Sequence, residues 1–129
     1  MKTGKISMIL FCIYIVAVIL LCVIRTEGLP DLPRNFMGIP LDKVAHFIMF
    51  LPFPVLGYLA FTPYASGIWR KIAVLGILCL IGCCFAYSTE KLQSFTAYRK
   101  YELVDMSADM IGIATGALAI LINIAIRHK

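Results

Sequence analysis

The stretch ISMILFCIYIVAVILLCVI, residues 6–24, decides the class of fold. It is an apolar run of 19 residues that contains no charge and follows Lys2 and Lys5. A secretory signal peptide has a shorter apolar core, of about 7–15 residues, and a small-residue cleavage site. This run is too long and has no such site, so we expect an uncleaved transmembrane helix.

Three further apolar segments follow, at about residues 44–61, 72–93 and 103–126. Each approaches the roughly 20 residues that a helix needs to cross about 30 Å of hydrocarbon. Pro52 and Pro54 interrupt the first of them, and we expect a kink there because proline cannot donate a backbone hydrogen bond. The sequence therefore predicts a single all-α domain over residues 1–129, a polytopic membrane protein built as a bundle of four transmembrane helices.

The composition excludes other classes of protein. The chain is 61% hydrophobic and only 15% charged, whereas a soluble domain has about 25% charged residues. Its net charge of +5 comes from basic residues scattered between apolar blocks, which argues against a nucleic-acid-binding stripe. The five cysteines lie within apolar runs and are interpreted as small packing residues, because Cys83 and Cys84 lack the spacing of a zinc site.

The charges also predict a topology. An even number of spans places both termini on one side, and the basic residues on that side are packed into short stretches next to the helix ends. Basic residues in this position favour the cytoplasm, so we expect both termini to be cytoplasmic and the protein to lie in the cell (plasma) membrane. All seven acidic residues fall on the opposite side: Glu27, Asp31, Asp42, Glu90, Glu102, Asp105 and Asp109.

Polar pairs, three or four residues apart, lie near the predicted outer ends of the last three helices: Asp42 and His46, Glu90 and Gln93, and Asp105 and Asp109. Asp109 is the most informative, because an ionised carboxylate inside a span costs roughly 2.5–3.5 kcal/mol unless it faces partners or water. Lys43 and Arg99 are possible basic partners. We therefore expect one outer-face site, with these binding residues: Asp42, Lys43, His46, Glu90, Gln93, Arg99, Asp105 and Asp109.

Structural roles for the same residues remain open. Asp42 is also suited to cap a helix N-terminus, His46 to pack as a hydrogen-bonded core residue, and Glu90 with Asp109 to form a structural ion-pair network. Gly112 and Gly116, on the helix face that carries Asp109, form a small-xxx-small pair that lets another backbone approach closely. That pair indicates that the face is turned into the bundle.

Three segments carry a resemblance to a known family: Asp42-Lys-Val-Ala-His-Phe47; Glu90-Lys-Leu-Gln93 with Arg99; and Asp105-Met-Ser-Ala-Asp-Met-Ile-Gly112. In order and spacing they resemble the Asp-Lys-x-x-His-Phe, Glu-x-x-Gln…Arg and Asp-x-x-x-Asn/Asp-x-x-Gly pattern of the VanZ-like family. The resemblance covers about residues 40–117. Asp109 stands where many members have Asn, which adds a charge.

The resemblance implies an integral membrane protein of the bacterial cell envelope. The family takes its name from a protein associated with glycopeptide (teicoplanin) resistance, so that resistance is one expected role. The expected partners are membrane lipids, a lipid-linked cell-wall precursor or a glycopeptide, and no nucleic acid. The oligomeric state stays open.

Two functions compete. In the first, the outer polar site binds a lipid headgroup or wall precursor. In the second, the protein is an intramembrane enzyme acting on a phospholipid or polyprenyl-linked substrate, with Glu90, His46 and Asp109 as candidate catalytic acids and bases. These side chains could also hold a divalent cation, although their spacing along the chain assigns no metal site. A transporter is disfavoured because the middles of the spans carry no charge.

Overall fold

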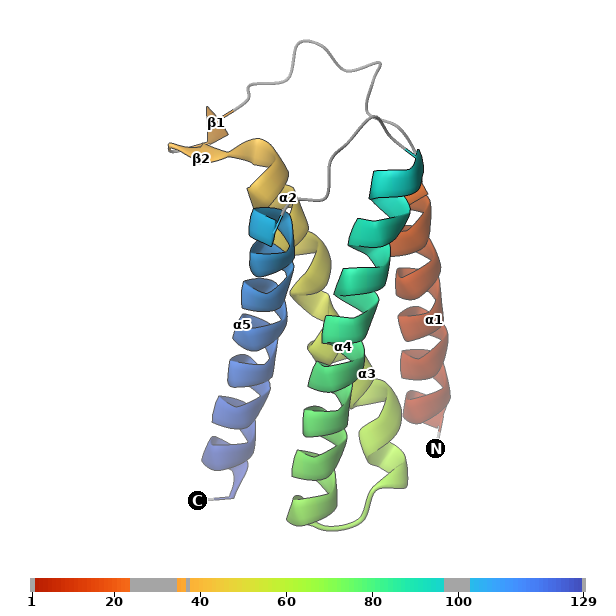
Figure 1. Cartoon of the computed structure of the whole chain (residues 1–129). Helices are drawn as coiled ribbons and strands as arrows, with labels where there is room; N and C mark the ends of the chain where they lie inside the picture. Colours follow the sequence, from red (N-terminus) through yellow and green to blue (C-terminus); the bar gives the residue numbers. More distant parts are fainter. Residues whose placement is uncertain (1, 24–34, 37, 97–102, 129) are drawn as a thin grey trace.

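The computed structural model describes residues 2–23, 35, 36, 38–96 and 103–128. Its longer elements are five α-helices: α1 (Lys2–Val23), α2 (Leu41–Phe50), α3 (Pro52–Phe61), α4 (Ile68–Thr96) and α5 (Leu103–Arg127). A two-residue hairpin, β1 (Asn35–Phe36) with β2 (Ile39–Pro40), precedes α2, and a 3₁₀ turn, η1 (Thr62–Tyr64), follows α3. Helices α2 and α3 follow one another as a single rod (Figure 1), the second of four candidate membrane spans in the described residues.

The described helices confirm the predicted all-α fold. Four segments are long and apolar enough to cross a membrane: Lys2–Cys22, Lys43–Tyr64, Ile68–Leu92 and Met106–Arg127. The first and third helices begin four residues earlier than the apolar runs at 6–24 and 72–93 predict, because their backbone hydrogen bonding continues through flanking polar residues. Both ends of the chain lie at the same end of the bundle (Figure 1).

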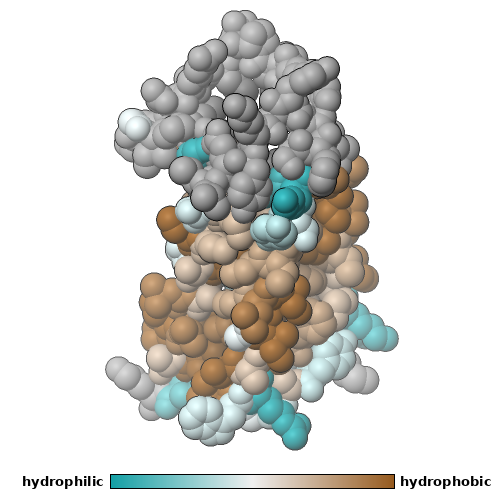
Figure 2. All heavy atoms as spheres, in the orientation of Figure 1, coloured by the Kyte–Doolittle hydropathy of each residue, from teal (hydrophilic) through white to brown (hydrophobic). Residues whose placement is uncertain are grey.

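The surface of the bundle is apolar. Large hydrophobic side chains stand exposed along α1, α4 and α5, among them Ile9, Leu20, Leu80, Ile111 and Leu118. On the face drawn in Figure 2, brown and tan residues cover the middle of the bundle, and hydrophilic residues lie at its lower end and beside the grey residues at its upper end. A soluble protein rarely exposes so large an apolar patch, whereas lipid tails cover such a surface without cost.

The second rod is broken where the prolines predict a kink. Helix α2 ends at Phe50 and α3 begins at Pro52. Pro52 and Pro54 have no backbone N–H to donate, so carbonyl groups in the preceding turn need other donors. The hydroxyl of Tyr14 on α1 donates a hydrogen bond to the carbonyl of Met49, which lies between the Ile48 and Phe50 carbonyls that the two prolines leave without a helical donor. The first helix thus stabilises the break in the second.

Aromatic rings fill the core beside this break. Phe53 is buried, and its ring lies 5.5 Å from the ring of Phe11 and 5.8 Å from that of Phe85. The Phe85 ring also lies 5.7 Å from the ring of Phe50. These contacts join α1, α2, α3 and α4 through large buried surfaces, which dominate core energetics.

Glycines bring α5 directly against the second rod. A Cβ added at Gly112 would lie 2.5 Å from the carbonyl oxygen of Phe47, and one added at Gly116 would collide with the carbonyl oxygen of Leu51. Only glycine permits this distance between the two backbones. Because Gly112 meets Phe47, Asp109 on the preceding turn of α5 is placed opposite His46 on α2.

Candidate functional site

A buried histidine–carboxylate pair joins α2 to α5. His46 Nδ1 lies 2.8 Å from Asp109 Oδ1, and the two residues are 5% and 0% exposed. At this distance a single proton is shared in a hydrogen bond, and a charged imidazolium would form an ion pair in the same geometry. The pair links residues 63 positions apart in the sequence.

Glu90 brings a second carboxyl group from α4. It is 3% exposed, and one ligand atom from each of His46, Glu90 and Asp109 lies within 4.8 Å of the others. We call these three residues the polar triad. Among the described residues, no hydrogen bond reaches two buried carboxylate oxygens of the triad, Glu90 Oε2 and Asp109 Oδ2.

An apolar layer supports the polar triad from the side of the membrane centre. Phe50, Ala86 and Ile113 each lie four residues, one helical turn, from His46, Glu90 and Asp109 respectively, and all three are buried in one cluster. Val18 and Cys22 of α1 complete that cluster. The layer separates the triad from the middle of the bundle and keeps its side chains at one level.

The electrostatics of the triad demand a compensating positive charge. Ligand oxygens of the two carboxyl groups lie within 4.8 Å of each other, and two full negative charges at that separation repel by at least about 3 kcal/mol at an effective dielectric constant of about 20. Burial adds a desolvation cost for each ionised carboxylate. The repulsion must therefore be offset by a bound proton, a basic side chain or a cation.

The other predicted site residues are placed less completely. Lys43 lies on α2 and is half-buried. Asp42, Gln93 and Asp105 belong to α2, α4 and α5, but their side chains lie outside the described part of the structure, as does Arg99 altogether. The structure therefore brings together three predicted residues, one from each of the three helices that carry the predicted polar pairs.

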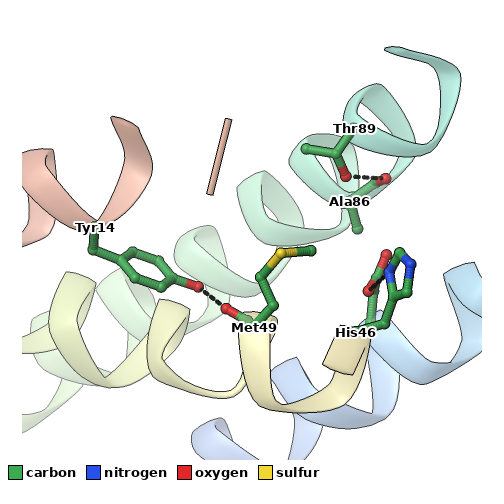
Figure 3. Close-up of polar contacts among 6 residues, drawn as sticks. Tyr14, His46, Met49, Ala86 and Thr89 are labelled. Carbon is green, nitrogen blue, oxygen red and sulfur yellow. Dashed lines mark hydrogen bonds and ion pairs between the residues drawn. The ribbon is translucent and has the colours of Figure 1, made fainter. Parts of the chain in front are cut away.

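Sequence analysis missed two features of the site. It placed His46 and Asp109 in one site but did not predict the hydrogen bond between them. It also assigned nothing to Tyr14, whose hydroxyl reaches the helix break one turn below the triad (Figure 3). A tyrosine in an apolar run is a usable signal, since a buried hydroxyl requires a hydrogen-bond partner.

The triad offers three kinds of chemistry: it can accept hydrogen bonds from a ligand, transfer protons, or coordinate a cation. Its imidazole and two carboxyl groups suit all three. Searches for related proteins add no assignment, since no protein-family model, no curated protein and no solved structure matches the chain. The resemblance to the VanZ-like family stays a prediction.

Proposed function

We propose that this chain is a VanZ-like integral membrane protein of the bacterial cell envelope, and that its polar triad binds the headgroup of a lipid or of a lipid-linked wall precursor. The observation that carries the proposal is the burial of His46, Glu90 and Asp109 together at the end of the bundle opposite the termini. Three helices that meet at ionisable groups near one membrane face form a site rather than a lipid-facing surface.

The proposed orientation puts the triad at the outer leaflet. The basic residues at the terminus end of the bundle include Lys2, Lys5, Arg70 and Arg127, all of them exposed. Exposed basic residues next to helix ends favour the cytoplasmic side of the plasma membrane. The triad, at the other end, then faces the leaflet in which wall precursors are presented after they cross the membrane.

The positions of the basic and acidic residues around the triad support a headgroup as the ligand. Lys43 lies about one turn before His46, near the N-terminus of α2, and Lys91 follows Glu90 and is exposed. Basic side chains at the rim attract phosphate, whereas the buried carboxylates repel phosphate and accept hydrogen bonds from hydroxyl or amino groups. The arrangement therefore fits a headgroup that carries both a phosphate and a sugar or an amine.

Teicoplanin resistance is the proposed role that can be tested in cells. Expression of the wild-type chain in a susceptible Gram-positive host should raise the inhibitory concentration of teicoplanin, and Glu90→Gln should abolish the increase. His128→Asn, which changes an exposed histidine at the far end of the bundle, serves as the control. If Glu90→Gln protects cells as well as the wild type at equal membrane levels, the proposed site is wrong.

One observation favours an intramembrane enzyme as the second candidate function. A histidine held by a carboxylate at 2.8 Å, with a further carboxyl group nearby, is the arrangement used for general acid–base catalysis. In this version His46 would accept a proton from a nucleophile acting on a phospholipid or polyprenyl-linked substrate, with Asp109 orienting the ring. Conversion of a labelled polyprenyl phosphate or phospholipid by purified protein, lost in His46→Asn, distinguishes this function from binding alone.

A further inference from the structure

We infer that the polar triad is a binding site for a divalent transition-metal ion of the Zn²⁺ or Mn²⁺ type. His46, Glu90 and Asp109, from α2, α4 and α5, each offer a ligand atom, and these atoms lie within 4.8 Å of one another. The inference concerns the ion alone and does not depend on the proposed role in binding a headgroup.

The spacing of the ligand atoms is close to that of a metal site. Zinc binds nitrogen and carboxylate oxygen at about 2.0–2.2 Å, which puts tetrahedral ligands about 3.4 Å apart. His46 Nδ1 and Asp109 Oδ1 are already 2.8 Å apart. In a zinc site this pair would open by about 0.6 Å and the widest separation in the triad would close by up to about 1.4 Å. Rotation of the long, three-torsion side chain of Glu90 can supply the second change while the helices stay in place.

The donor set selects the kind of ion. An imidazole favours zinc, iron, nickel and copper, whereas carboxylates favour manganese, magnesium and calcium. One imidazole with two carboxylates therefore matches Zn²⁺ and Mn²⁺ better than the harder Mg²⁺ and Ca²⁺. Three protein ligands also leave a coordination position for water or for a ligand oxygen, as in catalytic rather than structural zinc sites.

Burial strengthens the case for a cation. Water screens the repulsion within an acidic cluster on a protein surface. Here that screening is weak, because all three groups are at most 5% exposed. A divalent cation would cancel the two carboxylate charges and remove their mutual repulsion. The close backbone contact between Gly112 and Phe47 holds His46 and Asp109 in position before the ion arrives.

Binding must displace protons. In the structure a hydrogen bond joins His46 to Asp109, and a metal ligand has to give up the proton at its coordinating atom. Metal binding at the triad is thus coupled to proton release, which supplies a second, independent measurement.

The test uses the full-length protein in detergent micelles and Mn²⁺ as the probe, because Mn²⁺ prefers the triad's oxygen and nitrogen donors over the five cysteine thiols. We expect about one bound Mn²⁺ per chain by equilibrium dialysis. We also expect spin-echo modulation from a coordinated imidazole nitrogen, and release of protons in weakly buffered solution. Glu90→Gln and Asp109→Asn, which keep side-chain size, should weaken binding by roughly 10- to 100-fold or more.

Two controls make the result decisive. His128→Asn should leave Mn²⁺ affinity and the nitrogen signal unchanged, whereas His46→Asn should remove that signal. Circular dichroism and gel filtration will show that each variant is folded. No Mn²⁺ above the detergent blank for folded wild-type protein would overturn the inference, as would binding that survives all three triad substitutions. A failure here would leave the teicoplanin experiment unaffected.

Discussion

The contact between Gly112 and Phe47 makes a quantitative prediction. An alanine Cβ at position 112 would lie 2.5 Å from the Phe47 carbonyl oxygen, whereas ordinary contacts begin at 3.4 Å. The obstacle is backbone and cannot rotate away, so α5 must move from α2 by about 0.9 Å. Overpacking of this kind costs about 1–3 kcal/mol, and Gly112→Ala should lower the free energy of unfolding by that amount.

The same displacement should reach the polar triad. Moving α5 by about 0.9 Å lengthens the 2.8 Å separation of His46 Nδ1 and Asp109 Oδ1 to about 3.7 Å, beyond hydrogen-bond range. Gly112→Ala should therefore weaken Mn²⁺ binding as well as stability. Both effects follow from one backbone contact.

Unfolding of the purified protein by sodium dodecyl sulfate, followed by circular dichroism, gives the free energy, and Mn²⁺ titration of the same sample gives the affinity. The matched control is Gly76→Ala on α4, since an added Cβ there meets nothing within 4 Å. Equal stability and equal Mn²⁺ affinity of the two variants would refute the reasoning that glycine packing positions the triad.

Three further predictions address the helix break, the ion and the topology. Tyr14→Phe removes the donor to the Met49 carbonyl and should destabilise the bundle by about 1 kcal/mol in the same unfolding assay. The control, Tyr64→Phe, changes an exposed tyrosine and should leave the stability unchanged. Equal losses of stability in the two variants would contradict the proposed role of Tyr14. Mn²⁺ affinity should fall as the pH is lowered, because protons compete for the ligand atoms. An affinity that does not change between pH 8 and pH 5 would argue against carboxylate and imidazole ligands. A cysteine introduced at exposed Thr3 of a cysteine-free variant should resist a membrane-impermeant thiol reagent in intact cells, whereas one at Lys91 should react; the reverse pattern would invert the topology.

The fold was predictable because its signals are local. Each transmembrane helix is a continuous apolar run, and the prolines that break the second run are visible in the sequence as they are in the structure. The predicted positions of the helix ends were less accurate, because hydropathy marks only the part of a helix that contacts lipid. Helix α4 begins at Ile68, and includes the exposed Trp69 and Arg70, before its apolar run starts.

The level of the site was also predictable, but its contacts were not. The positions of His46, Glu90 and Asp109 along their helices place them near one membrane face without any knowledge of packing. Which of them touch depends on how each helix is rotated and how closely the axes approach, and the close contact at Gly112 sets both for α5. Metal-ligand spacing rules do not address the triad for the same reason, because they describe ligands on one or two neighbouring segments, whereas these three side chains come from three helices.

The polar triad takes its members from α2, α4 and α5. Its second carboxylate, Asp109, therefore lies on the last described helix. During synthesis, α2 and α4 reach the bilayer first, and His46 and Glu90 then lack the Asp109 side chain that meets them in the finished bundle. Lateral docking of α5 completes the hydrogen bond to His46 and the glycine contact with the second rod together. Assembly of the bundle and maturation of the triad are consequently a single event.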